Sequence, residues 1–261
     1  MASGSKVEFL RKLEKRKLER LEKDAELRKV VERVFDHSTL LSLYDLLKKG
    51  VLSEFYGVVS TGKEANIFSA LDCSGQYLAV KIYKVATADF KRKFEYISAD
   101  PRFHGLRRDR RAVVYAWVTR EFKNLQRAQE AGVSAPRPVA FSKNILVMEF
   151  IGEDGVPYPR MVDQPPEDPR TTFELVLENM EKLYQKGKLV HSDLSEYNIL
   201  LTPSPVFIDF SMATDVANPA AEGLLRRDVE KILNYFQRFK FELPSSEELL
   251  NRLCGSGSVA T

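Results

Sequence analysis

The sequence contains few cysteine and histidine residues, and this excludes several kinds of protein. Two cysteines, Cys73 and Cys254, in 261 residues are too few for a disulfide framework, so we expect a reducing compartment, the cytoplasm. Three histidines lying far apart argue against a structural zinc site. No apolar run approaches the roughly 20 residues of a membrane helix, and the first residues lack the pattern of a signal peptide. We therefore expect no membrane association.

The composition is that of an ordinary globular protein. Hydrophobic residues make up 44% of the chain and charged residues 30%. The length suits one two-lobed domain or two small domains. The net charge is only +3, but basic residues gather in 6–35 and in 84–117. We interpret the first segment as an amphipathic helix and the second as a long basic insertion without helical periodicity. Each is either a solvated surface or a contact surface for an acidic partner.

The stretch from Val190 to Phe210 carries the densest chemical pattern. Two short apolar runs, 199–201 and 206–208, are separated by a Pro-Ser-Pro turn and predict a hairpin. Such a hairpin brings Asn198 and Asp209 to the same end, where their oxygens suit Mg²⁺. Asp193 would stand free beside the metal, able to orient a hydroxyl group or a water. This is an arrangement for phosphoryl transfer.

Taken singly, Asp193 or Asp209 is better explained as a solvated acid at a turn of a buried hairpin. The combined pattern is more specific. His191, Asp193 and Asn198 form H-x-D-x-x-x-x-N, and the following apolar strand ends in Asp-Phe. This spacing matches the catalytic loop and the metal-binding aspartate of protein kinases.

Alternating residues predict three strands with tight turns, at 55–60, 66–71 and 76–83. The first turn contains Ser60, Thr61, Gly62 and Lys63. Residues 57–63 fit the start of a Walker A loop, but Glu64 stands where that motif requires Ser or Thr, and a strand follows instead of a helix. The glycine-rich hairpin of kinases is the better comparison, because small residues let the backbone approach phosphates.

A lysine inside the third strand, Lys81, follows Ala79 and Val80 in a pattern that resembles V-A-I-K. A lysine in an apolar strand is costly unless it is paired or binds an anion. We expect Glu121, near the start of a helix at 118–132, to be its partner, with Glu130 as the alternative.

The remaining elements complete the predicted order. Ser38 or Thr39 caps a helix at 40–49 that ends at Gly50, and a hairpin covers 139–142 and 145–149. Residues 148–152 then cross between lobes, where a kinase binds adenine; here we expect Met148, Glu149 and Ile151 to do so. A Pro-rich loop at 156–169 precedes helices at 171–185, 222–239 and 246–253.

The two N-terminal helices, at 6–35 and 40–49, suggest a helix-turn-helix DNA-binding motif. A strand pattern follows where the recognition helix should be, so we expect no DNA binding.

Four segments together resemble the RIO family of atypical protein kinases, RIO-one type. They are Ser60-Thr61-Gly62-Lys63-Glu64-Ala65-Asn66, Ala79-Val80-Lys81, the stretch from His191 to Asn198, and Ile208-Asp209-Phe210. The resemblance covers roughly residues 40–239. The compact chain is more similar to an archaeal than to a eukaryotic member. The resemblance implies an α+β fold, a trimmed bilobal kinase with an antiparallel N-lobe sheet and a mainly helical C-lobe.

The implied domains are an N-terminal helical extension at 6–50, an N-lobe at 51–150 and a C-lobe at 151–254 that lacks the activation segment and the late helices. The resemblance also implies roles: Lys81 on the phosphates of ATP, Asp193 as catalytic base, and Asn198 and Asp209 on Mg²⁺, for which Mn²⁺ can substitute. Members act in maturation of the small ribosomal subunit, several mainly as ATPases, with the metal-binding aspartate (here Asp209) transiently phosphorylated.

Two residues depart from ordinary kinases. Ser195 replaces the basic residue two positions after the catalytic aspartate, and Ser211 replaces the glycine of D-F-G. Both departures weaken the case for a peptide kinase. The alternative is a nucleotide-gated module that binds the precursor of the small ribosomal subunit, its RNA and proteins, with little phosphotransfer. A small-molecule phosphotransferase shares the loop motif, but this C-lobe is too short to build its acidic substrate pocket.

Overall fold

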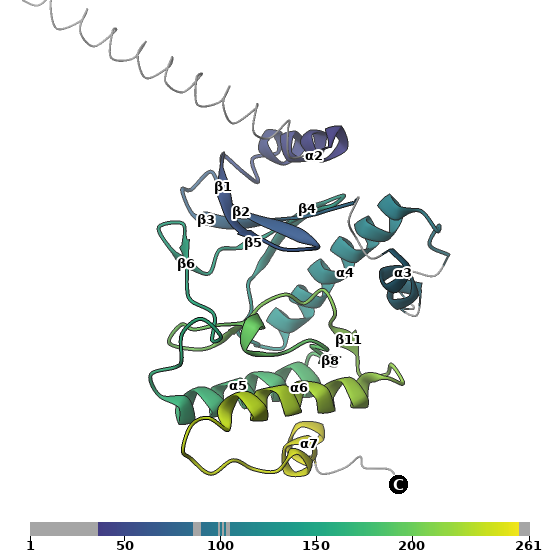
Figure 1. Ribbon diagram of the computed structural model, residues 1–261. Coiled ribbons are helices and arrows are strands. Elements are labelled where there is room, and N and C mark those ends of the chain that lie inside the picture. Colours follow the sequence, from purple (N-terminus) through teal and green to yellow (C-terminus); the bar gives the residue numbers. More distant parts are fainter. Residues whose placement is uncertain (1–35, 86–89, 99, 101, 103–104, 256–261) are drawn as a thin grey trace, which may run out of the picture.

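A five-stranded antiparallel sheet lies above a mostly helical lobe (Figure 1). The structure is a computed structural model that describes residues 36–255 except 86–89, 99, 101 and 103–104, so the helix predicted at 6–35 lies outside the described residues. The sheet has the order β1-β2-β3-β5-β4. Its strands are β1 Glu54–Thr61, β2 Ala65–Leu71, β3 Tyr77–Tyr83, β4 Pro138–Ser142 and β5 Ile145–Glu149. The predicted meander and the later hairpin are confirmed.

The alternation along β3 assigns its side chains to two cores. The core on one face contains Leu78, Val80 and Ile82, together with Leu43 and Leu46 of helix α2 (His37–Lys48). The core on the other face contains Ala79 and Tyr83, together with helix α4 (Arg110–Glu130) and the lower lobe. Successive strand residues point to opposite faces. Lys81, between Ala79 and Tyr83 in this alternation, therefore points toward α4.

Helix α2 covers the outer face of the sheet and starts earlier than predicted. Its cap is Asp36, whose carboxylate accepts a hydrogen bond of 2.8 Å from the Thr39 N–H. The predicted cap at Ser38 or Thr39 is wrong: both residues lie in the first turn, where the Thr39 hydroxyl also donates to Asp36. Gly50, at φ 71°, follows the helix as predicted.

The segment 84–117, predicted to lack regular structure, contains helix α3 (Phe90–Ser98) and the first part of α4. Helix α4 starts at Arg110, not at Val118, because the Asp109 carboxylate caps it by accepting from the Ala112 N–H at 3.0 Å. Residues 112–118 are almost all apolar. Several faces of α4 are buried here, so no polar face marks a helical period.

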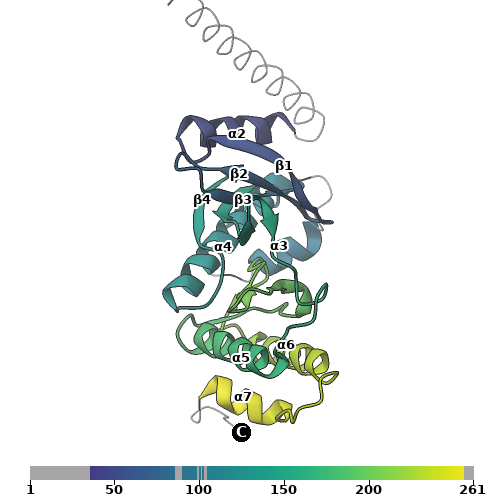
Figure 2. The same ribbon diagram turned by 90° about the vertical axis from the view of Figure 1, so that its left-hand side faces the viewer.

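The lower lobe is built on three helices, α5 (Pro169–Gln185), α6 (Ala221–Phe236) and α7 (Ser246–Cys254). Phe173 of α5 packs against Phe236 of α6 with ring centroids 5.1 Å apart. Both views place α7 beneath this pair (Figures 1 and 2). Two-residue strands connect the rest: β6 Gly152–Glu153, β7 Val156–Pro157, β8 Leu189–Val190, β9 Ile199–Leu200, β10 Val206–Phe207 and β11 Thr214–Asp215. The predicted α+β class is confirmed.

Candidate active site

The loop of residues 191–198 lies between β8 and β9. Strand β9 pairs with β10 as an antiparallel hairpin, with Ile199 opposite Phe207. One residue further along, the Ile208 N–H donates to the Asn198 carbonyl at 3.0 Å. Asn198 and Asp209 therefore lie at the same end of the hairpin, as the sequence predicts.

Lys81 connects the sheet to this hairpin. Its ammonium lies 2.7 Å from Glu121 Oε1 of α4 and 3.0 Å from Asp209 Oδ1. The Tyr83 hydroxyl donates to the second oxygen of Glu121. Lys81 and Glu121 are buried, whereas the Asp209 side chain is 44% exposed. The predicted ion pair of Lys81 with Glu121 is present, and Glu121 lies in the middle of α4 because that helix begins earlier than predicted.

The opposite charges in this cluster keep Lys81 protonated and Asp209 ionised. Burial alone would lower the pKa of the Lys81 ammonium, but the carboxylates of Asp209 and Glu121 raise it well above its ordinary value. Burial alone would raise the pKa of the Asp209 carboxyl. The charge of Lys81 and hydrogen bonds from Ser211 and Lys81 instead hold that pKa below its ordinary range. At neutral pH the site thus presents an ammonium beside an ionised, solvent-accessible carboxylate.

The backbone at Asp209 is strained and is held in place by α4. Asp209 has a φ of 63°, in the left-handed region that non-glycine residues rarely adopt. Downstream carbonyls accept hydrogen bonds from two buried side chains of α4: Arg120 donates to Ser211 and Ala213, and Asn124 donates to Phe210 and Ala213. These four bonds, of 2.8 to 3.1 Å, fix the segment that follows Asp209.

A buried acid of α6, Asp228, holds the other half of the site. Its two oxygens accept from the backbone N–H groups of Ser192, at 2.7 Å, and Leu194, at 3.0 Å. These residues flank Asp193, and Ser192 has a φ of 70°. The loop conformation that presents Asp193 is therefore specified by one carboxylate from a helix later in the chain.

Asp193 is exposed, and it is not free as predicted. Lys231 of α6 places its ammonium 2.9 Å from Asp193 Oδ1. The Asn198 side-chain amide donates to the Asp193 carbonyl at 2.8 Å and lies 3.5 Å from its carboxylate. The difference arises because α6 returns over the loop, a contact that no local pattern indicates.

The first residue of the motif, His191, has a packing role. Its ring is 2% exposed and lies 4.9 Å from the Phe210 ring, centroid to centroid. Its Nε2 lies 3.1 Å from the Ile208 carbonyl. Burial lowers the pKa of His191, so the ring is neutral at pH 7 and donates through Nε2–H. This hydrogen bond joins the loop to the residue that follows β10.

Ser60 and Thr61 end β1, and Gly62 and Lys63 begin the turn to β2; all four residues are exposed. The Gly62 N–H donates to the Ala65 carbonyl at 2.9 Å, and a Cβ at Gly62 would lie 3.1 Å from that same oxygen. A side chain at Gly62 would therefore press on the turn. Glu64, beside it, forms an ion pair of 2.9 Å with the buried Lys93 of α3, which links the turn to that helix.

The crossover between the lobes follows β5. Met148 faces the inner core, where it lies opposite Ala79. The Glu149 N–H donates to the Arg137 carbonyl, and the Ile151 carbonyl accepts from the Tyr158 N–H. These two hydrogen bonds do not use the Glu149 carbonyl or the Ile151 N–H, which are the backbone groups that we expect to bind adenine. That role stays a prediction.

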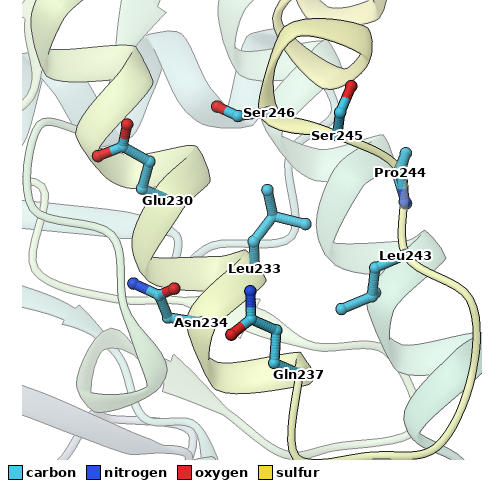
Figure 3. A pocket seen from close by; sticks show the side chains of 8 residues that line it. All are labelled: Glu230, Leu233, Asn234, Gln237, Leu243, Pro244, Ser245 and Ser246. Atoms are coloured by element: carbon cyan, nitrogen blue, oxygen red, sulfur yellow. The ribbon is translucent and has the colours of Figure 1, made fainter.

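Two surface pockets lie away from these residues. A pocket of about 450 Å³ between α6 and α7 is lined by Leu233, Leu243 and mostly uncharged polar residues (Figure 3). The pocket contains none of the predicted site residues, so the cluster around Lys81 remains the candidate site.

Among the described residues, no group of three or more His, Cys, Asp or Glu side chains could hold a metal ion. No described helix is long and apolar enough to span a membrane.

The comparisons with known proteins show the family of the chain. The family model described as RIO domain matches residues 66–249. The chain belongs to the RIO domain family. The RIO-type serine/threonine-protein kinase Rio1 of Methanocaldococcus jannaschii is 45% identical over 230 residues, covering 87% of this chain and 78% of that protein. Rio1 of Haloferax volcanii is 44% identical, covering 83% and 74%. The predicted resemblance to RIO kinases, an enzyme family, is confirmed.

The RIO assignment extends to the fold. The Rio2 kinase of Chaetomium thermophilum, solved as an ADP/Mg²⁺-phosphoaspartate complex, superposes with a TM-score of 0.63 at 20% identity, covering 84% of this chain and 67% of that chain. Human serine/threonine-protein kinase RIO1 is 35% identical, and the chain spans 41% of its length. The trimmed kinase-like fold predicted from the sequence is therefore confirmed.

The residues of this RIO chain fit a Mg²⁺ ion carried by a nucleotide. Asn198 and Asp209 offer hard oxygen ligands at one end of the hairpin, and Asp209 is both ionised and exposed. Mg²⁺ is typically bound by one or two protein carboxylates with substrate phosphates and waters completing its shell. A site with only two protein ligands is therefore chemically adequate.

Sequence reasoning missed four functional side chains of this RIO site: Tyr83, Arg120, Asp228 and Lys231. Asp228 left a usable signal, because an acid lies among Leu225, Val229 and Ile232 on the apolar face of α6. Tyr83 lies two residues after Lys81, and Arg120 directly precedes Glu121, both of which the sequence predicts as site residues. Lys231 left no signal, since a lysine on a helix is ordinarily a surface residue.

Proposed function

We propose that this chain is a Mg²⁺- and ATP-dependent RIO-type serine/threonine kinase and ATPase. The observation that carries the proposal is the cluster of Lys81, Glu121 and Asp209, together with an exposed Asp193 on the loop that leads into the same hairpin. In protein kinases a strand lysine paired with a helix glutamate and a metal-binding aspartate must all be in place for phosphoryl transfer. Those side chains meet here.

The proposed roles follow from charge and exposure. Lys81 neutralises phosphate oxygens, and the backbone N–H groups of 60–63 lie around them. Asn198 and Asp209 hold Mg²⁺, which screens the charge of the phosphates when bound. Asp193 orients the attacking hydroxyl group or water. Because these groups are fixed before the reaction, catalysis is mostly positioning and charge stabilisation.

A further part of the proposal is a phosphoaspartate at Asp209. This carboxylate is ionised, exposed and next to a lysine. Its free oxygen can therefore attack the terminal phosphorus of ATP. The bond between that phosphorus and the bridging oxygen breaks, and ADP leaves with the electron pair. Water then releases inorganic phosphate. The related Rio2 kinase was solved as a phosphoaspartate complex, which supports the same chemistry in this chain.

The test is to incubate the protein with γ-labelled ATP and Mg²⁺ and to examine any protein-bound label for alkali lability. We expect an alkali-labile label that is lost in Asp209→Asn. An alkali-stable label lost in Asp193→Ala would instead indicate a kinase that phosphorylates its own serine or threonine. Lys81→Ala should abolish turnover while the fold stays intact, and near-normal turnover there would exclude the assignment.

The second candidate function is a nucleotide-gated module that binds the precursor of the small ribosomal subunit. Four exposed arginines precede or begin α4, Arg107, Arg108, Arg110 and Arg111, and they favour an anionic partner such as RNA. Binding to small-subunit RNA should then weaken steeply as salt rises. A flat salt response, measured by fluorescence anisotropy with and without ATP, would argue against this function.

A further inference from the structure

Lys231 is a charged contact of the site that the proposed function leaves unused. It lies on α6, is 42% exposed, and directs its ammonium to Asp193 Oδ1 at 2.9 Å. Exposed ion pairs of this kind contribute little to stability, typically about 0 to 1 kcal/mol. A reason for this lysine is therefore better sought in the chemistry of the site than in folding.

The position of Lys231 is set by the same helix that shapes the catalytic loop. Asp228, three residues earlier, binds the backbone on both sides of Asp193. Residues three apart on a helix lie on one face. A single face of α6 therefore fixes the Asp193 backbone and brings a cation to its side chain.

A cation is missing from the loop itself. Ordinary protein kinases carry a basic residue two positions after the catalytic aspartate, whereas this chain has Ser195 there. Ser195 is only 8% exposed and directly precedes the short 3₁₀ turn Glu196–Asn198. It can neither carry charge nor extend to the transferring phosphoryl group.

The cation proposed to bind the phosphate oxygens, Lys81, lies on the Asp209 side of the site. Lys81 is paired with Glu121 and Asp209 and has 7% side-chain exposure. Lys231 approaches Asp193, the residue proposed to orient the nucleophile. A charge beside the nucleophile stabilises the negative charge that develops on the equatorial oxygens in the transition state.

We propose that Lys231 is a catalytic residue that replaces, from α6, the loop cation that Ser195 has lost. It holds the Asp193 carboxylate and contacts the terminal phosphate of the bound nucleotide. This inference rests on the proposed function. It predicts that Lys231 distinguishes a triphosphate from a diphosphate, because only the triphosphate carries the group that it contacts.

The experiment compares wild type with Lys231→Met, Lys231→Arg and a matched control, Lys182→Met. Lys182 is a lysine of α5 that is 32% exposed and forms an ion pair of 2.8 Å with Glu178. For each protein we would measure ATP turnover, the affinities for a nonhydrolysable triphosphate analogue and for ADP with Mg²⁺ by calorimetry, and the thermal unfolding midpoint.

We expect Lys231→Met to lower turnover about tenfold to a hundredfold and to reduce the preference for triphosphate over ADP by about tenfold, since a preorganised charge is removed. Its unfolding midpoint should stay within about 4 °C of wild type. Lys231→Arg should retain most of both properties, and Lys182→Met should match wild type.

Unchanged turnover and nucleotide preference in Lys231→Met would overturn the inference while the proposed function stands. A fall in turnover with an unchanged preference would also overturn it, because Lys231 would then only position Asp193. A wild-type protein that neither binds nor hydrolyses ATP would overturn the proposed function itself.

Discussion

Asp228 shows how one side chain can specify a catalytic loop. It is 1% exposed and accepts two backbone hydrogen bonds. Burial raises the pKa of the Asp228 carboxyl to about 7, although both backbone N–H groups act in the opposite direction. The folded chain thus binds a proton here more tightly than the unfolded chain, whose carboxyl has an ordinary pKa.

This raised pKa predicts a pH dependence of stability. Because the folded-state pKa lies above the unfolded-state value, the contribution of Asp228 to the free energy of unfolding is largest below about pH 4 and falls as the pH rises to about 7. The slope is at most about 1.4 kcal/mol per pH unit. Asp228→Asn cannot titrate, so its urea-derived stability should differ from wild type by an amount that changes across this range. Parallel pH profiles would contradict the assignment.

Sequence alone predicts some contacts of the site and not others. The pair of Lys81 with Glu121 follows from a physical demand, since a lysine in a buried strand needs an anion. The contacts of α6 do not follow in this way. Asp228 lies 36 residues from Ser192, and Lys231 lies 38 residues from Asp193. No periodicity relates residues at such separations, so only the folded chain reveals them.

At the level of elements, α4 connects the sheet to the segment after Asp209. Glu121 faces Lys81, and Arg120 is bound to the carbonyls of Ser211 and Ala213 and to the Asp100 carboxylate at 3.0 Å. The Arg120 side chain is 1% exposed. Its guanidinium therefore satisfies three acceptors that have little access to water.

Arg120→Met should destabilise the protein by about 3 kcal/mol, because the buried Ser211 carbonyl loses its donor, and the Ala213 carbonyl and the Asp100 carboxylate each keep only their second partner, Asn124 and Arg102. The matched control is Arg111→Met on the same helix, where the arginine is 58% exposed and lies 3.5 Å from Asp36. That change should cost about 0.5 kcal/mol or less. Urea unfolding of both variants decides the matter, and equal effects would contradict the role of Arg120.

The five strands of the sheet were predictable because each is a short apolar or alternating run bounded by turn residues. This holds even for β3 and β5, which are buried on both faces. The start of α4 was hidden, because its apolar run from Ala112 to Val118 is buried on several faces. The capping residue Asp109 was also hidden among four arginines. Tertiary packing decided what the local pattern left open.

At the scale of the whole molecule, α4 should make unfolding a single event. It packs in the same core as Tyr83 of the sheet and Phe236 of the lower lobe. The chain has one tryptophan, Trp117, which is 1% exposed within α4. Its fluorescence and the far-UV circular dichroism should give coincident urea transitions. Two separated transitions would show that the lobes unfold independently.

Nucleotide binding should stabilise the whole fold by mass action. At a free ATP·Mg²⁺ concentration of about 100 times Kd, the expected gain is about 2.7 kcal/mol. The gain should depend on Mg²⁺, and it should be absent in Lys81→Met and in Asp209→Asn. A thermal shift of equal size in these variants, at the same ligand concentration, would place the nucleotide elsewhere.

Helix α4 is bonded both to Lys81 of the sheet and to the segment that follows Asp209, and this has a consequence for regulation. Many protein kinases are switched on by moving the corresponding helix so that its glutamate reaches the strand lysine. Here the glutamate already reaches Lys81, and the adjacent turn of α4 is hydrogen-bonded to the chain beyond Asp209. We therefore expect an enzyme that needs no activator, whose rate in the cell is governed by the supply of ATP and by which molecules gain access to Asp193.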